Sequence, residues 1–126
     1  MIRVENIQKY FPIKDGFFNK KNGDVKAVEN VSFEIPEGEI LGLVGESGSG
    51  KSTLGRSLIR LIEPTNGKIF YNNEDITEFS EKEMRKLRKD FQIIFQDPYA
   101  SLDPRKKIFD IISQGISIHS KMNKSQ

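Results

Sequence analysis

The 126-residue sequence contains no cysteine, which excludes disulfides and thiolate metal sites. This absence is consistent with a reducing compartment. The sequence also has no apolar run that approaches the roughly 20 residues needed to cross a bilayer. Residues 1–9 alternate apolar and charged side chains where a signal peptide would have its apolar core. We therefore expect no signal peptide, and we expect any membrane role to be peripheral.

A strong excess of either charge is also missing. Lys and Arg number 20 and Asp and Glu number 18, for a formal net charge of +2. A nucleic-acid-binding protein is usually far more basic, so no nucleic-acid partner is expected. The remaining composition, 36% hydrophobic and 30% charged, is typical of one soluble domain that is long enough to bury a core.

One stretch carries most of the chemical information: Gly45-Glu46-Ser47-Gly48-Ser49-Gly50-Lys51-Ser52-Thr53. It fits the spacing of a phosphate-binding loop, in which glycines let backbone N–H groups surround an anion. Lys51 is placed to reach the β- and γ-phosphates, and the Ser52 hydroxyl to bind Mg²⁺. The alternative is a Gly/Ser-rich surface turn with a solvated lysine, which the flanking sequence disfavours.

The flanking sequence predicts the strand and the helix that such a loop requires. Residues 40–44 are a continuous apolar run, typical of a parallel strand that is buried on both faces. Four apolar side chains after the loop recur at helical spacing and predict a helix over residues 51–62: Leu54, Leu58, Leu61 and Ile62.

An antiparallel layer is predicted around this core. Its expected strands alternate with period two or follow turn residues, and they cover residues 2–7, 25–28, 31–35 and 68–71. Residues 12–24 are expected to form a surface hairpin or loop with Phe17 and Phe18 as its apolar anchor. Packing of these two rings on the domain is preferred over their use as a contact surface.

The second half of the chain predicts two helices and one more strand. Ser80 and Glu83 form a capping box that opens a charged helix ending at Leu87, and residues 108–118 have helical spacing. Residues 91–95 are a second apolar strand candidate, which ends at Gln96. Because ligands of open α/β sheets lie beyond the carboxyl ends of the strands, Gln96 and Gly45 are expected to face one nucleotide.

These residues together closely resemble the nucleotide-binding subunits of ABC transporters, within them the oligopeptide/dipeptide importer branch. The resemblance rests on the loop at residues 45–53 and on three further stretches: Ile93-Ile94-Phe95-Gln96-Asp97-Pro98-Tyr99-Ala100-Ser101-Leu102, Tyr10-Phe11-Pro12-Ile13 and Val25-Lys26-Ala27-Val28. It implies an α/β P-loop NTPase core of the ABC type with an antiparallel β layer. Residues 1–126 would be the N-terminal and incomplete part of that domain.

The resemblance also implies a role for each site residue, with ATP and Mg²⁺ as cofactors. Tyr10 resembles the aromatic residue that stacks on adenine, with Phe11 as the competing candidate. Residues 45–53 would bind the phosphates, Lys51 would act in catalysis, and Ser52 would bind the metal. Gln96 resembles the glutamine that reaches Mg²⁺ and the attacking water.

The implied function is to couple ATP binding and hydrolysis to peptide import. Residues 99–105, which begin with Tyr99 and end with Arg105, would contact transmembrane permease subunits. A second ATP-binding subunit would complete a homo- or heterodimer, and a peptide-binding protein would act indirectly. The implied location is the cytoplasm, peripheral on the inner face of the cell membrane.

The sequence departs from the family in two ways. Asp103 stands where members usually have Asn, and Ser49 where they often have Cys; both are expected to be tolerated. More important, no Leu-Ser-Gly-Gly-Gln signature, acidic strand motif or switch histidine occurs; after Gly67 the only glycine is Gly115, and His119 lies in a polar tail. We therefore expect the N-terminal portion of a longer subunit, inactive by itself.

Two alternatives remain open. The chain could be a truncated, non-hydrolysing nucleotide-binding module. It could also be a different P-loop NTPase, such as a small-molecule kinase or a GTPase, although no Asn-Lys-x-Asp run is present to read guanine.

Overall fold

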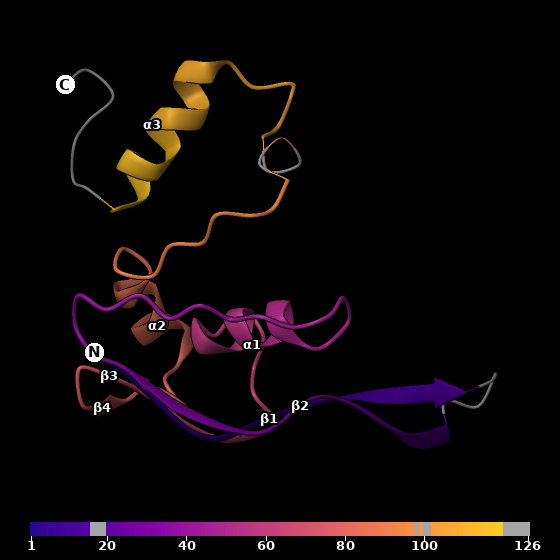
Figure 1. The fold of residues 1–126 in the computed structure, drawn as a ribbon. Coiled ribbons are helices and arrows are strands. Elements are labelled where there is room, and N and C mark those ends of the chain that lie inside the picture. The colour runs from indigo at the N-terminus through magenta and orange to yellow at the C-terminus, as the bar shows by residue number, and fades with distance from the viewer. Residues whose placement is uncertain (16–19, 98, 100–101, 120–126) are drawn as a thin grey trace. The chain divides into compact units, whose positions relative to one another are not determined.

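The structure is a computed structural model that describes residues 1–15, 20–97, 99 and 102–119 (Figure 1). The chain divides into two compact units, Met1–Met84 and Arg85–Gln126, which are described separately below. The expectation for Phe17 and Phe18 lies outside the described residues. No helix in the described part of the chain is long and apolar enough to cross a membrane.

The first unit contains the predicted antiparallel layer. Its sheet is formed, in the order β2-β1-β3-β4, by β1 Ile2–Asp15, β2 Lys20–Ile35, β3 Asn66–Tyr71 and β4 Glu74–Asp75. All three pairings are antiparallel. The predicted strands are confirmed but β1 and β2 are longer than expected, because their pairing continues past Pro12, opposite Asp24, into the predicted surface hairpin.

A bulge in β1 allows the sheet to bury one apolar face. Val4 and Ile7 are both almost fully buried, although residues three apart on a regular strand point to opposite faces. The pairing shifts between them, and Asn6 has a φ of 49°, so the extra residue turns Ile7 back to the core. The apolar core of the described residues comprises Val4, Ile7, Val28, Leu54, Ile69, Ile76 and Met84.

Helix α1, Lys51–Leu58, packs on β1 and β2 and is shorter than predicted (Figure 1). It ends in a Schellman motif, in which Leu61 N–H donates to Arg56 O at 2.9 Å and Arg60 N–H donates to Ser57 O at 2.9 Å. Arg60 has a φ of 50°, the conformation that usually favours glycine at this position. The predicted helix over residues 51–62 is therefore wrong in its last turn.

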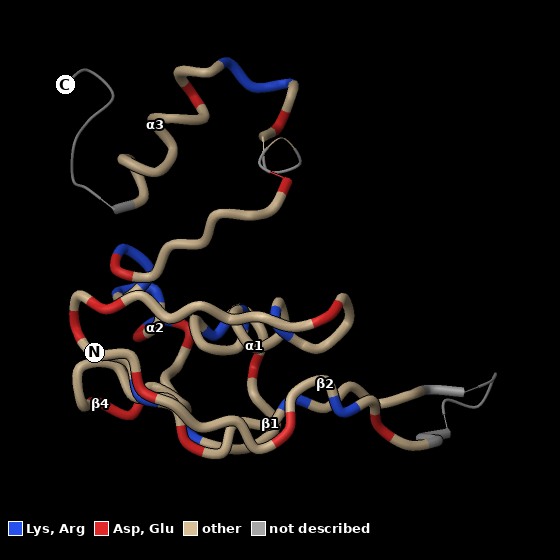
Figure 2. The backbone as a smooth tube through the Cα atoms, viewed as in Figure 1, with Lys and Arg blue, Asp and Glu red and all other residues tan. Residues whose placement is uncertain are grey.

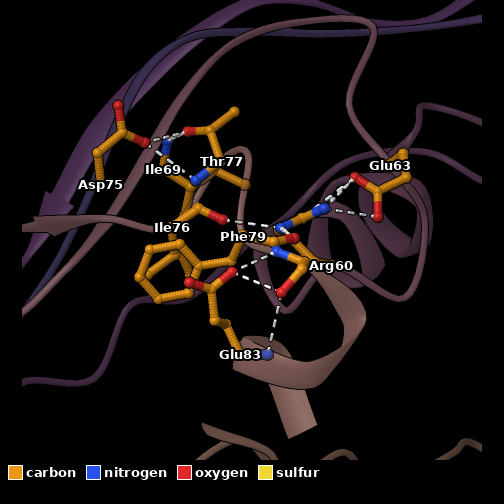
Figure 3. Close-up of polar contacts among 9 residues, drawn as sticks. Arg60, Glu63, Ile69, Asp75, Ile76, Thr77, Phe79 and Glu83 are labelled. Atoms are coloured by element: carbon orange, nitrogen blue, oxygen red, sulfur yellow. Dashed lines mark hydrogen bonds and ion pairs between the residues drawn. The ribbon is translucent and has the colours of Figure 1, made fainter. Parts of the chain in front are cut away.

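The Arg60 side chain explains why an arginine is held in this conformation (Figure 3). Its Nη1 donates to Ile76 O at 2.9 Å and to Phe79 O at 2.7 Å, and its side chain is only 8% exposed. The Nε–Nη2 edge of the guanidinium pairs with Glu63, with 2.7 Å between Nη2 and Oε2. Arg60 thus connects the end of α1 to the loop that follows β4.

Replacing Arg60 by methionine is expected to lower the free energy of unfolding by about 2–3 kcal/mol. The methionine keeps an apolar stem but leaves the Ile76 and Phe79 carbonyls without this charged donor. The matched change, Glu63→Gln, removes a partner that is 62% exposed and should cost less than about 1 kcal/mol. Urea unfolding of both variants checks the difference; equal losses would show that the ion pair, and not the carbonyl contacts, stabilises this junction.

Helix α2, Glu81–Leu87, confirms the predicted capping box. Ser80 N–H donates to Glu83 Oε2 at 2.8 Å, and Glu83 N–H donates back to Ser80 Oγ at 3.4 Å (Figure 3). The second unit contains helix α3, Ile108–His119, which confirms the helix predicted over residues 108–118.

The two predicted parallel strands are not found. Residues 40–44 and 91–95 pair with no strand among the described residues. Ile40 is 96% exposed and Ile94 is 94% exposed. Neither run contains a charged residue, although charged residues lie on both sides of each run (Figure 2). The expectation of two strands was wrong because a parallel strand needs neighbours on both edges and both faces, which the described residues do not supply. The same lack of partners explains why the apolar side chains of both runs are exposed.

Candidate functional site

The loop at residues 45–50 has the backbone that its glycines predict. Ser49 N–H donates to Glu46 O at 3.2 Å, which closes a turn. Gly48 and Gly50 have φ values of 81° and 92°, in the left-handed region where a Cβ is unfavourable. Turn backbone that alternates between right- and left-handed conformations can point successive N–H groups toward one concavity, an arrangement that suits an anion.

Helix α1 begins directly after this loop and adds its own N–H groups. Gly50 is the N-cap and provides no side-chain cap, and the first turn contains no acidic residue. The first intrahelical bond of this end runs from Leu54 N–H to Gly50 O, at 2.8 Å. Because the first amides of a helix have no intrahelical acceptor, this end is suited to bind an anion.

The Lys51 side chain folds back across the loop. Its Nζ donates to Gly45 O at 2.7 Å, to Glu46 O, and to Ser49 Oγ at 3.1 Å. These contacts hold a positive charge directly over the turn. The ammonium has three N–H donors, so a phosphate bound in the loop would replace at least one of these three contacts to form a charge-assisted hydrogen bond with Lys51.

Of the two predicted metal ligands, Ser52 and Gln96, only Ser52 belongs to the stretch at residues 45–53. Among the described residues, no group of three or more His, Asp or Glu side chains could hold a metal ion. Ser52 is exposed in the first turn of α1, next to Lys51. A single hydroxyl fits Mg²⁺ where the remaining ligands are phosphate oxygens and water, as is usual for this ion.

Strand β2 forms the wall beside the loop. A Cβ added at Gly50 would come within 2.1 Å of Ala27 O, so the two backbones are in direct contact. A pocket of about 370 Å³ lies between them, and its lining includes Val28, Leu43 and Lys51. Part of the exposed run at residues 40–44 thus lines this pocket.

Tyr10 lies on β1, opposite Lys26 of β2. Its backbone N–H donates to Thr65 Oγ1 at 3.0 Å, and its hydroxyl donates to Glu29 Oε1 at 3.2 Å. The Lys26 Nζ lies 5.6 Å from the centre of the Tyr10 ring. Desolvation, followed by the nearby Glu29 charge, raises the pKa of the Tyr10 hydroxyl, so the phenol stays a neutral hydrogen-bond donor.

Comparison with known proteins decides the family. Residues 28–126 match the family described as "ABC transporter". The chain belongs to the ABC transporter family. It is 50% identical over 121 residues to the oligopeptide transport ATP-binding protein AppF of Bacillus subtilis, and 50% identical over 119 residues to the glutathione import ATP-binding protein GsiA of Escherichia coli.

These alignments cover 95% and 94% of this ABC chain but only 37% and 19% of the two relatives. Two solved dimeric structures of the ATP-binding cassette MJ0796 have the same fold, with TM-scores of 0.82 and 0.79 at 25% and 27% identity. The first of them holds ADP and Pi. Each match covers 99% of this chain and 51% of the neighbour, so the chain spans about half of those cassettes.

The ABC fold class is thus confirmed, and the described part of the sheet is open. The first unit brings together the loop at residues 45–53, the pocket wall at Ala27, and the β1–β2 pair that carries Tyr10. Gln96 is exposed and belongs to the second unit, so its role beside the phosphate loop stays a prediction.

The predicted permease contact also lies in the second unit. Tyr99 is 81% exposed and its N–H donates to Asp97 Oδ1 at 3.0 Å. Arg105 N–H donates to Asp103 Oδ1, also at 3.0 Å. A carboxylate oxygen of Asp103 therefore fills an acceptor role that the side-chain carbonyl of asparagine also provides, which supports the expectation that this departure is tolerated.

Three contacts of the site were missed in the sequence: those made by Lys26, Glu29 and Thr65. Lys26 and Glu29 are three residues apart, a spacing that places side chains on opposite faces of a regular strand. Thr65 lies between the helix predicted over residues 51–62 and the strand predicted over residues 68–71, outside every predicted element. The contacts of Lys26 and Glu29 with Tyr10 follow from a bulge in β2: Lys9 is opposite Val28 but Tyr10 is opposite Lys26, so Ala27 is an extra residue. The alternation of the sequence gave no signal for this bulge.

Proposed function

We propose that this chain is the nucleotide-binding portion of an ABC transporter subunit that couples ATP binding and hydrolysis to peptide import. The observation that carries the proposal is the loop geometry: Lys51 lies across a turn of glycine-rich backbone that leads into an uncapped helix N-terminus. The names of the two relatives, an oligopeptide and a glutathione import protein, support peptides as the cargo class.

In this proposal each part of the site has one task. The loop amides and Lys51 bind the triphosphate, and Ser52 contributes one oxygen ligand to Mg²⁺. The ring of Tyr10 supports the base, and Gln96 reaches the metal and the attacking water. Residues 99–105 meet the permease, and a second ATP-binding subunit completes the dimer at the inner face of the membrane.

The purified 126-residue chain is expected to bind Mg-ATP without turning it over. It contains the phosphate loop but no acidic strand motif and no signature sequence, and phosphoryl transfer depends on both positioning and charge stabilisation. Calorimetric titration measures the binding, and release of inorganic phosphate measures turnover. Absence of saturable ATP binding would contradict the proposal. Robust phosphate release would contradict the expectation that hydrolysis needs the acidic strand motif and the signature sequence.

Two further measurements separate the alternatives. A competition panel of ATP, GTP and CTP distinguishes this chain from a GTPase, because stacking on a tyrosine discriminates weakly among bases whereas a GTPase strongly prefers GTP. Uptake of a labelled tripeptide by source cells with and without the gene tests the import function. Unchanged uptake would contradict peptide import while leaving nucleotide binding intact.

A further inference from the structure

Positive charge is concentrated at the C-terminal end of the sequence. Residues 105–126 contain five Lys and Arg residues and one Asp, a net charge of +4, although the whole chain has a net charge of only +2. Residues 1–104 therefore carry a net charge of −2. Such an asymmetry within one chain is typical of a segment that meets an anionic partner.

Helix α3 lies between basic residues. Three of them come directly before the helix and are exposed (blue in Figure 2): Arg105, Lys106 and Lys107. The sequence after the helix adds Lys121 and Lys124. Within the described residues, neither Arg105 nor Lys107 forms an ion pair. The positive charge at the start of α3 is therefore open to a partner from outside.

One side of α3 is a narrow polar stripe. At helical spacing it comprises Asp110, Ser113, Gln114 and Ser117. The Ser117 hydroxyl donates to Gln114 O at 2.9 Å, and the Lys106 Nζ donates to Gln114 Oε1 at 3.1 Å. The stripe is thus bonded to its own helix and to the basic residues before it.

The other side of α3 is a wider apolar face. It comprises Ile108, Phe109, Ile112, Ile116 and Ile118, which are each between 51% and 77% exposed. Gly115 is the only other residue between Ile112 and Ile118 that falls within this face, so no polar side chain interrupts it. A contiguous exposed apolar face of this kind marks an interaction site.

The length and charge of this segment fit the surface of a bilayer. A helix of 12 residues is about 18 Å long, too short for a hydrocarbon core of roughly 30 Å, so it can only lie in the interface. Amphipathic helices with basic residues bind there through their apolar face and through attraction to anionic lipids. A second copy of the chain would instead bring the same excess of positive charge to the apolar face.

We propose that α3 and the basic residues before it form a lipid-binding surface. The apolar face enters the headgroup region of a bilayer that contains anionic phospholipid, and Lys106 and Lys107 meet the lipid phosphates. This inference goes beyond the proposed function and does not depend on nucleotide binding. It assigns the chain a membrane contact of its own, separate from any contact with a permease.

Vesicles of two compositions test the charge dependence with the whole 126-residue chain. Co-sedimentation should show at least about tenfold tighter binding to equal parts of phosphatidylcholine and phosphatidylglycerol than to phosphatidylcholine alone, because each basic side chain near an anionic surface contributes roughly fivefold. The double variant Lys106→Gln/Lys107→Gln should lose most of this preference. Lys82→Gln/Lys86→Gln is the matched control, since it removes two exposed lysines from α2, and should bind like the wild type.

The apolar face is tested by tryptophan fluorescence, because the chain contains no tryptophan. On addition of the mixed vesicles, Ile112→Trp should shift its emission to shorter wavelength, whereas Ser117→Trp in the polar stripe should keep the emission of an indole in water. Ile112→Gln should weaken vesicle binding about tenfold, because it removes one apolar side chain from the membrane. Ser117→Gln should leave binding unchanged. Glutamine is a good helix former, so both variants keep α3.

Several results would overturn this inference. They are the absence of vesicle binding, equal binding to both lipid compositions, and equal emission shifts at positions 112 and 117. A lipid-free dimer that Ile112→Gln dissociates, found together with no vesicle binding, would assign the apolar face to a second copy. ATP titration of the same samples keeps the two proposals apart: a chain that binds ATP but no vesicles contradicts only the lipid-binding surface.

Discussion

Replacing Lys51 by alanine is expected to weaken the binding of Mg-ATP by at least about tenfold. The Lys51 ammonium lies over the turn at residues 45–49, where it contacts Gly45 O and Ser49 Oγ. It is also the only lysine or arginine among residues 45–53. A hydrogen bond to a charged group contributes about 1.5–3 kcal/mol, which corresponds to roughly a ten- to hundredfold change in affinity. Titration with a fluorescent ATP analogue measures the change.

Lys68→Ala is the matched control for this experiment. Lys68 is an exposed lysine of β3 whose ammonium lies 3.7 Å from Asp75, and its loss should leave nucleotide affinity unchanged. Circular dichroism and urea unfolding of both variants establish that the fold persists, since Lys51 also bonds to loop carbonyls. Equal affinities of the wild type and Lys51→Ala would refute the assignment of the phosphate site.

The elements that could be predicted from sequence are those that local patterns determine. The capping box of Ser80 and Glu83 needs only residues three apart, and α3 follows from its apolar spacing. The antiparallel strands follow from period-two alternation, because a strand that packs only one face on the core has apolar side chains at every second position. The phosphate loop was predictable for the same reason, as its glycines act on their own backbone.

The elements that were missed depend on contacts that no local pattern records. Residues 40–44 have the apolar composition of a buried strand, but pairing and burial require neighbours that the described chain does not place beside them. The end of α1 was missed because Arg60 adopts a positive φ that its buried guanidinium contacts stabilise. The pairing of Tyr10 with Glu29 depends on the bulge at Ala27, and one extra residue in a strand reverses the facing of all that follow.

The contact between Gly50 and the β2 bulge leads to the second large effect. Gly50→Ala is expected to lower the free energy of unfolding by more than about 2 kcal/mol and to weaken Mg-ATP binding together with it. A φ of 92° costs a residue with a Cβ about 1–2 kcal/mol, and the new Cβ would also lie 2.1 Å from the backbone oxygen of Ala27. Either the start of α1 or the bulge must move.

Two other glycines separate the collision from the conformational strain. Gly48 has a φ of 81° but no atom within 4 Å of an added Cβ, so Gly48→Ala should cost only the roughly 1–2 kcal/mol of strain. Gly55 lies inside α1 with no such neighbour, and Gly55→Ala should stabilise the chain by about 0.5–1 kcal/mol. Urea unfolding should therefore rank Gly55→Ala above the wild type, then Gly48→Ala, then Gly50→Ala. If Gly50→Ala unfolds like Gly48→Ala and still binds nucleotide, the β2 bulge yields at little cost and does not fix the position of the loop.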